Sequence, residues 1–433
     1  MRTRLSLITN NLTIILITVA ALVNRIWNLS QPKGYIFDEV YYVKNANSLI
    51  RHGVELSGQP LSGEFIVHPP LGKWLIGVGI QIFGNNEFGW RISAAVFGTA
   101  LVPLIYLIAL RLFKSSFIAN ICALLLAVDG LALVMSRTAL LDIFLTFFLV
   151  LAVLFWLQQK HALAGISIGL AGSVKWNGAF IFTAIFIFAL YKIYVMMKLK
   201  EFDFVYLLVQ FRNYFLIPLI TYVLSWSGWF FTSTGWKRNN STNPLLSLWN
   251  YHLEILSFHR NLTQPHPYSA NPFGWLWLRR PTSFYFESET LGKSCGASKC
   301  AQEILALGTP VLWWIAGVSL FLLIYELFRF KTKLAILVLA PITSLYLPWL
   351  LLSHRTTFYF YSITFLPFLI LAVGYLINRI KNLKPESELF TLWLPITIVA
   401  IIAANYLYFL PIFMGLNIPY AAWLKLMWLK SWI

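Results

Sequence analysis

LLDIFLTFFLVLAVLFWLQ, residues 140–158, contains a single charged side chain. An apolar run of about 20 residues is long enough to cross a bilayer core as a helix, and comparable runs recur from residue 5 to residue 410. Of the 433 residues, 59% are hydrophobic and 11% are charged, whereas soluble proteins carry about 25% charged residues. The sequence therefore predicts an all-α polytopic membrane protein. It excludes a soluble enzyme, a secreted disulfide scaffold and a disordered tail, and also a β-barrel, whose strands would alternate apolar and polar residues.

We predict eleven membrane-spanning helices from these runs. They cover residues 5–27, 91–112, 116–135, 140–158, 162–175, 178–198, 213–231, 309–328, 334–352, 358–378 and 389–410. With the amino terminus in the cytoplasm, Lys and Arg are enriched in the inner segments, as membrane topology requires. The net charge of +17 is then a signal of orientation in the membrane, and we expect no nucleic-acid partner. The first run follows Arg2 and Arg4 and lacks a small-residue cleavage site, so we interpret it as a retained anchor.

The chain is predicted to be one integral domain, residues 1–433, with two long outer segments at 28–90 and 232–308. Three short helical patterns lie in these segments. They are 38–51, which ends at Gly53, 70–83, which ends at Gly84, and 245–259. Because helices of this length do not span a bilayer, we expect them to lie at the membrane interface and contact membrane lipids.

Asp38 and Glu39 form an acidic pair just beyond the first predicted span, in GYIFDEVYY. Asp is a leading helix-cap residue and Glu39 would be favoured by the helix dipole, so capping of the following helix is one interpretation. The other is a general base at the membrane surface, where partial burial tunes a carboxylate. Capping would orient Asp38 without preventing that role, so both residues are catalytic candidates.

The three short outer loops carry one cation each, namely Arg137, Lys175 and Arg355. Cations there oppose the positive-inside trend. A phosphate on a membrane lipid would explain them, since Arg grips phosphate bidentately and Lys acts as a point charge; snorkelling to headgroups is the alternative. Asp129 and Asp142 flank Arg137 at the ends of apolar runs, where a charge is costly unless paired. We therefore expect a structural ion pair with Arg137.

Further candidate substrate contacts lie in two motifs of the outer segments. VHPPLGKW supplies His68 and Lys73, although His68 could merely satisfy the chain where it enters a helix and Lys73 could snorkel to headgroups. The stretch HPYSANPFGWLWLRR supplies His266, Tyr268 and Trp275. Aromatic residues at this density indicate either an interfacial belt or a platform for a sugar or peptide.

Cys295 and Cys300 lie in CGASKC, within the second outer segment. We predict a disulfide between them, because the outer side of a cell membrane is oxidising. Zinc is the weaker alternative, since two cysteines without clear partners make only half a site. We expect no metal and no other cofactor if the cations of the outer loops neutralise a lipid phosphate.

Together these features suit the transfer of a group from a lipid phosphate to a hydroxyl. The leaving phosphate needs cations more than a proton, whereas the incoming hydroxyl needs a base. One carboxylate suffices for an inverting displacement, unlike the two carboxylates of glycoside hydrolysis. A transporter would instead place polar or broken segments near the middle of the membrane, and here the ionisable residues gather at the outer ends.

The chain also resembles a known family between about residue 35 and about residue 361. The motifs that carry the resemblance are FDEVYYV, HPPLGKWLIG, FGWR, SRTALLD, SVKWNG, HPYSANP, RRPTSFYF and CGASKC followed by LALGTP. Jointly they look like dolichyl-phosphate-mannose protein mannosyltransferases of the actinobacterial type.

The resemblance implies a C-type glycosyltransferase (GT-C) fold and inverting transfer of mannose from polyprenyl-phosphate-mannose to Ser or Thr hydroxyls of exported proteins, with a link to the translocon. It places Asp38 on the proposed catalytic base, Glu39 on its partner, and Arg137 and Lys175 in motifs after the third and fifth spans. The second outer segment is too short for the β-trefoil insert of eukaryotic members, which implies a bacterial plasma-membrane enzyme with an extracytoplasmic active site. A related transferase that acts on a lipid or glycan is the alternative.

Overall fold

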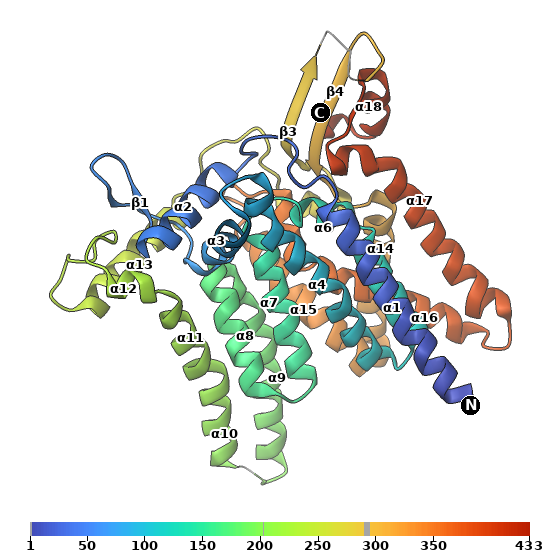
Figure 1. The fold of residues 1–433 in the computed structure, drawn as a ribbon. Coiled ribbons are helices and arrows are strands. Elements are labelled where there is room, and N and C mark those ends of the chain that lie inside the picture. Colours follow the sequence, from blue (N-terminus) through green and yellow to red (C-terminus); the bar gives the residue numbers. More distant parts are fainter. Residues whose placement is uncertain (1, 202, 290–294) are drawn as a thin grey trace.

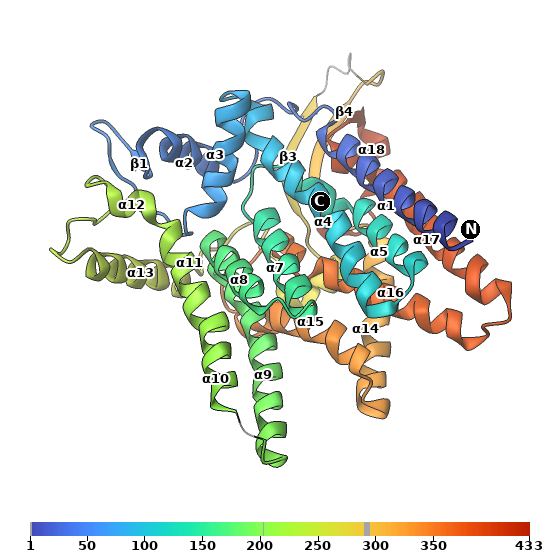
Figure 2. The same cartoon turned by 60° about the horizontal axis from the view of Figure 1, so that its bottom comes forward.

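The computed structural model describes residues 2–201, 203–289 and 295–433. Its helices form a bundle, and the two long outer segments gather at one end of that bundle, away from the amino terminus (Figure 1). A second view shows that α9 and α10, whose bounds follow below, project beyond the other helices at the opposite end (Figure 2).

The bundle helices are apolar along most of their length, as the runs in the sequence require. They are α1 (Arg2–Ile26), α4 (Glu87–Phe113), α5 (Ser116–Ala127), α6 (Gly130–Met135), α7 (Asp142–Leu157), α8 (His161–Val174), α9 (Phe180–Lys198), α10 (Phe204–Phe211), α11 (Ile217–Ser225), α14 (Pro310–Phe330), α15 (Lys333–Leu351), α16 (Leu366–Leu383) and α17 (Leu394–Met414). Aliphatic and aromatic side chains between these helices form one large buried core.

Seven helical stretches in the described ranges are long and apolar enough to cross a membrane. They are Glu87–Phe113, Trp176–Lys198, Phe204–Ser225, Pro310–Phe330, Lys333–Leu351, Leu366–Leu383 and Leu389–Met414. The other four predicted spans fall on α1 and on the shorter apolar helices α5, α7 and α8. A mostly helical, multi-pass membrane protein is therefore confirmed, and length and composition support seven of the eleven predicted spans.

One predicted span, residues 116–135, is two helices in the structure. Its second helix begins at Gly130, where the Asp129 carboxylate accepts the backbone N–H of Ala132 at 2.9 Å. Asp129 and Gly130 form a dipeptide that is typical of turns, so the sequence did carry a signal for this break.

The outer segments, the residues just before the second of them and the chain after α17 fold into short helices and strands above the bundle (Figure 1). These are α2 (Glu39–His52), β1 (Leu56–Ser57), β2 (Ser62–Gly63), α3 (Leu71–Phe83), α12 (Ser227–Phe231), α13 (Pro244–Arg260), β3 (Thr282–Glu289), β4 (Cys300–Ala306), β5 (Asn417–Pro419) and α18 (Tyr420–Leu426). The three short helices predicted in the outer segments are confirmed as α2, α3 and α13. Gly53 ends α2 with a φ of 77°, a left-handed conformation that suits glycine.

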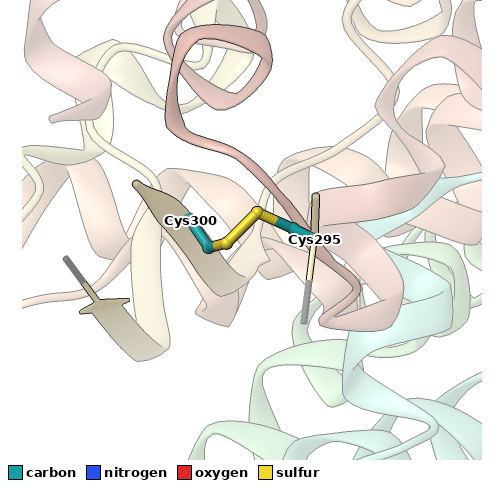
Figure 3. Close-up of a disulfide and its surroundings, with 2 residues drawn as sticks. All are labelled: Cys295 and Cys300. Carbon is teal, nitrogen blue, oxygen red and sulfur yellow. A yellow bond between two sulfur atoms is a disulfide. The ribbon is translucent and has the colours of Figure 1, made fainter. Parts of the chain in front are cut away.

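A three-stranded sheet corrects the all-α prediction. β4 pairs antiparallel with both β3 and β5, so the sheet joins the second outer segment to the chain that follows α17. The sequence of β3, TSFYFESE, is rich in the aromatic and β-branched residues that favour strands. At the start of β4, Cys300 is joined by a disulfide to Cys295, with their Cα atoms 6.1 Å apart (Figure 3).

The first outer segment meets α12, which leads into the second outer segment, at a pair of glycines. A Cβ atom on Gly228, in α12, would lie 1.9 Å from the carbonyl oxygen of Gly53 at the end of α2. No side chain fits at that separation. The absence of a side chain at Gly228 therefore allows α12 to pack directly against the turn that ends α2.

We expect replacement of both Cys295 and Cys300 by Ser to loosen the hairpin of β3 and β4. Closing a loop this short constrains the unfolded chain by about 2 kcal/mol, so a protease added to the detergent-solubilised variant should cut the hairpin faster than in the unaltered protein. Cys122→Ala, in α5, is the matched control because Cys122 is buried and free. Equal cleavage rates, or free thiols at both hairpin positions in the non-reduced protein, would contradict this expectation.

Candidate active site

The acidic pair at the start of α2 is divided between two environments. Glu39 is 0% exposed and forms a two-pronged ion pair with Arg91 of α4, with 2.8 Å from Nε to Oε1 and 2.8 Å from Nη2 to Oε2. The same carboxylate accepts the backbone N–H groups of Ala139, at 2.9 Å, and Ile36, at 3.0 Å. Glu39 does not line the cavity described below, so we assign it to positioning.

Arg91 also holds the chain that leads from α1 into α2. Its guanidinium donates to the carbonyl oxygens of Leu29 (3.2 Å), Pro32 (3.0 Å) and Gly34 (3.1 Å). With the two bonds to Glu39, every nitrogen of this buried side chain has a partner, as burial of a guanidinium requires. The backbone just before and just after Asp38 is thereby fixed to α4.

Asp38 faces a cavity of about 1070 Å³. Its side chain makes no capping hydrogen bond to α2, although it stands at the cap position, so the interpretation of Asp38 as a helix cap is wrong. The cavity walls come from α2, the loop before α3, the start of α7, the chain from α8 into α9, the end of α13, and the chain between α15 and α16. Segments far apart in the sequence thus enclose one carboxylate.

Burial raises the pKa of the Asp38 carboxyl to about 6. The positive charge of Lys175 lowers this pKa and the negative charge of Asp142 raises it, both less than burial does. Asp38 is therefore ionised at neutral pH and binds a proton more readily than an exposed aspartate, which suits a general base.

Lys175, at the end of α8, is ion-paired with Asp142 at the first turn of α7. Its Nζ lies 2.7 Å from Oδ2 of Asp142 and 5.3 Å from the ring centre of Tyr361, and all three residues line the cavity. The expected ion pair between Arg137 and an aspartate is therefore wrong. Asp142 pairs with Lys175, and Asp129 accepts hydrogen bonds from backbone N–H groups and from Trp313.

Arg355 is a half-buried cation of the same cavity. Its guanidinium lies 5.8 Å from the ring centre of Trp349, and it takes part in no ion pair among the described residues. Its buried Nε has no hydrogen-bond partner there. Burial lowers the pKa of Arg355. A half-buried guanidinium without a carboxylate partner is suited to bind an anionic ligand.

Arg137 is not part of the cavity. Its Nη1 donates to the carbonyl oxygens of Asn24 (3.2 Å), Arg25 (3.0 Å) and Trp27 (2.7 Å), at the end of α1. A cation satisfies the free carbonyl groups of a helix end and interacts well with its dipole. Of the cations in the three short outer loops, the cavity therefore holds two, Lys175 and Arg355.

His68 and Lys73 both line the cavity. Burial and the nearby charge of Lys175 lower the pKa of His68 well below its usual range, so its imidazole is neutral. The ring of His68 stacks on that of His259, with centres 5.4 Å apart. Lys73 is paired with Glu55 at 2.6 Å, within the protein and not in headgroups.

The other predicted substrate contacts, His266, Tyr268 and Trp275, lie outside the cavity lining. Trp275 is buried, donates to the carbonyl oxygen of Ala270 at 3.1 Å and packs among aromatic side chains of the core. Tyr268 lies under the guanidinium of Arg280. Trp275 is therefore a core residue, whereas a sugar or peptide platform stays a prediction for the exposed side chains of this stretch.

The sequence interpretation missed several cavity residues, namely Tyr42, Trp176, His259 and Tyr361. It also assigned Asp142 to the wrong partner. A carboxylate inside an apolar run is by default a functional candidate, and that signal was available for Asp142. No group of three or more His, Cys, Asp or Glu side chains in the described part of the chain is placed to hold a metal ion.

Two family models match the chain. The model described as dolichyl-phosphate-mannose-protein mannosyltransferase matches residues 15–228, and the model of the C-terminal four-helix membrane region of protein O-mannosyltransferases matches residues 244–432. A polyprenol-phosphate-mannose–protein mannosyltransferase of Mycolicibacterium smegmatis is 30% identical over 481 aligned positions, which cover 96% of this chain and 92% of that protein. The chain belongs to the protein mannosyltransferase family.

The chain is also similar to a further relative and to solved structures of other membrane transferases. A relative of the same name from Corynebacterium glutamicum is 30% identical over 96% of the chain and 92% of its own length. The protein O-mannosyltransferase Pmt1–Pmt2 complex of Saccharomyces cerevisiae matches with a TM-score of 0.81 at 16% identity, over 98% of this chain and 93% of that one. ArnT of Cupriavidus metallidurans matches with a TM-score of 0.54 at 14% identity, over 93% and 74%. These likenesses agree with a GT-C-like fold.

We expect Glu39→Gln to lower the free energy of unfolding by about 3 to 5 kcal/mol, because it leaves the buried charge of Arg91 without its partner. Denaturant or thermal unfolding of the purified protein in detergent measures the loss. Glu64→Gln is the matched control, since Glu64 is a partly exposed carboxylate of the same outer segment that accepts one hydrogen bond from Asn45. A Glu39→Gln protein that is as stable as the unaltered one, yet inactive, would place Glu39 in the chemistry instead.

Proposed function

We propose that the chain transfers mannose from a polyprenyl-phosphate-mannose lipid to Ser or Thr hydroxyl groups of exported proteins. Near-full-length similarity to polyprenol-phosphate-mannose–protein mannosyltransferases supports the donor and the protein acceptor. The observation that carries the proposal is the placement of Asp38, a carboxylate of raised pKa in a cavity that also holds Lys175 and an unpaired Arg355.

In this proposal Asp38 removes the proton of the acceptor hydroxyl as its oxygen attacks C1 of mannose. The bond between C1 and the phosphate oxygen breaks, and its electron pair leaves with the polyprenyl phosphate. Attack on the face opposite the phosphate inverts the configuration at C1, and one base is enough for this displacement. The proton ends on Asp38 and is lost to water when product leaves.

Arg355 and Lys175 would bind the phosphate of the donor. Arg355 offers a guanidinium that no carboxylate of the described residues neutralises, and Lys175 offers an ammonium at the edge of the same cavity. Negative charge grows on the phosphate as the sugar leaves, so these cations bind the transition state more tightly than the ground state.

We place the reaction on the extracytoplasmic side. Several helices run away from the cavity and end in cations, and Figure 1 shows their ends opposite the outer segments. The cations lie near the end of a helix or just after it: Arg111 and Lys114 at α4, Lys198 and Lys200 at α9, Arg329 and Lys331 at α14, and Arg379 and Lys381 at α16. Positive charge marks the cytoplasmic side of a membrane protein, so the cavity would open on the other side, where exported proteins emerge.

We expect Asp38→Asn to lower the rate of mannose transfer by about 100-fold to 10,000-fold, the range typical for loss of a positioned general base. Asn keeps the shape of the side chain and removes the base, so binding of the donor should persist. The measurement is transfer of labelled mannose from polyprenyl-phosphate-mannose to Ser/Thr peptides by the purified enzyme, with donor binding measured separately. A folded Asp38→Asn protein with near-normal turnover would refute the assignment, and transfer to a lipid or glycan but not to peptides would change the acceptor class.

We expect Arg355→Ala to weaken donor binding and to lower turnover, by about 10-fold to 100-fold in total, since a hydrogen bond to a charged group contributes about 1.5 to 3 kcal/mol. Titration with the donor and initial rates at saturating donor separate the two effects. Arg329→Ala is the matched control, because Arg329 is an exposed cation in the last turn of α14, at the opposite end of the bundle. If both variants behave like the unaltered enzyme, Arg355 only anchors its loop in headgroups.

A further inference from the structure

Asp142 is a buried carboxylate that phosphate binding does not explain. It is 0% exposed, and its Oδ2 lies 2.7 Å from Nζ of Lys175. Its other oxygen, Oδ1, is buried and has no hydrogen-bond partner among the described residues. Asp142 also lines the cavity that holds Asp38. The carboxylate is therefore only half satisfied, in the same cavity as the candidate base.

A carboxylate at this position opposes the binding of a phosphate. It neutralises Lys175, one of the two cations proposed for the donor, and it repels an incoming anion. A buried ion pair is also weak evidence for stability, because both charges must leave water. The dipole of α7 stabilises an anion at the start of the helix. A carboxylate there would be stabilised in this way whether or not it contacted Lys175, so the dipole does not explain the ion pair.

We propose that Asp142 sets the base strength of Asp38 by offsetting the positive charge of Lys175 in the shared cavity. This inference rests on the proposed function, in which Asp38 takes the proton of the acceptor hydroxyl. Asp142 is a positioning residue in this scheme, since it acts through Lys175 and Asp38 and touches no reacting atom.

The groups that face Asp38 support this balance. They are Tyr42 from its own helix α2, Asp142 from α7, Lys175 from the end of α8, and Tyr361 from the turn before α16. The two phenols are uncharged at neutral pH, so Asp142 and Lys175 carry the charges among these four groups. Arg355, another cation of the cavity, is the same in every variant compared below. Lys175 alone would stabilise the ionised carboxylate and make it a weaker base. With Asp142 beside it, Lys175 can bind phosphate without removing the basicity that Asp38 needs.

The test is the pH dependence of kcat/KM for mannose transfer by the purified enzyme. The base must be ionised, so the rate should fall as the pH drops below the pKa of Asp38, about 6. In Asp142→Asn the unopposed charge of Lys175 should move this fall to lower pH by about one unit. In Lys175→Gln the remaining charge of Asp142 should move it to higher pH by a similar amount. The double variant lacks both charges, and its fall should lie between those of the single variants.

A matched control separates this effect from damage to the fold. Glu326→Gln breaks the ion pair of a buried carboxylate with Arg379, and neither residue lines the cavity, so it should lose stability without moving the fall in rate. The double variant, which leaves no unpaired buried charge, provides a folded protein if Asp142→Asn does not fold. The inference is overturned if kcat/KM falls at the same pH in the unaltered enzyme, both single variants and the double variant. A fall near pH 6 that persists in Asp38→Asn instead overturns the assignment of Asp38 as the base.

Discussion

Moving the charges of Glu39 and Arg91 out of water costs several kcal/mol for each ion, and the chain recovers that cost by giving each charge several partners. The guanidinium binds three backbone carbonyl groups, and the carboxylate binds two backbone N–H groups. The pair therefore ties α4, the chain between α1 and α2, and the chain before α7 to one point. Asp38 owes its position to its neighbour in sequence, because Glu39 cannot move without leaving a buried charge unpaired.

The adjacent residues Asp38 and Glu39 thus lie in different environments. Consecutive side chains on a helix point about 100° apart, so Glu39 enters the bundle while Asp38 faces the cavity. The environments then separate their chemistry: a fully paired carboxylate is locked in place, and a buried, unpaired one gains affinity for a proton. From the sequence alone the pair FDE is symmetric, and only the position of Arg91 across the bundle decides which carboxylate is free.

The membrane-crossing helices were predictable because a bilayer allows few alternatives to a long apolar helix. The span predicted at 178–198 is α9, Phe180–Lys198. The sheet was missed because β3 follows a stretch already dense with aromatic residues, and because its third strand, β5, comes only after all the bundle helices. Asp38, Lys175 and Arg355 were predictable as cavity residues from charge placement at the outer ends of spans. The partners of Arg137 and Asp142 were not, because Lys175 and Asp142 are 33 positions apart and only the packing of α7 against α8 brings them together.

The outer sheet fixes an order of assembly for the site. Phe284 of β3 stacks on Phe37, the residue before Asp38, with ring centres 4.7 Å apart. β3 is held by β4, and β4 is held on its other side by β5. Since β5 follows α17, a ribosome must translate every bundle helix before the sheet can close over the residues next to Asp38. Asp38 precedes every bundle helix from α4 onward, yet its surroundings are completed only after β5 has been synthesised.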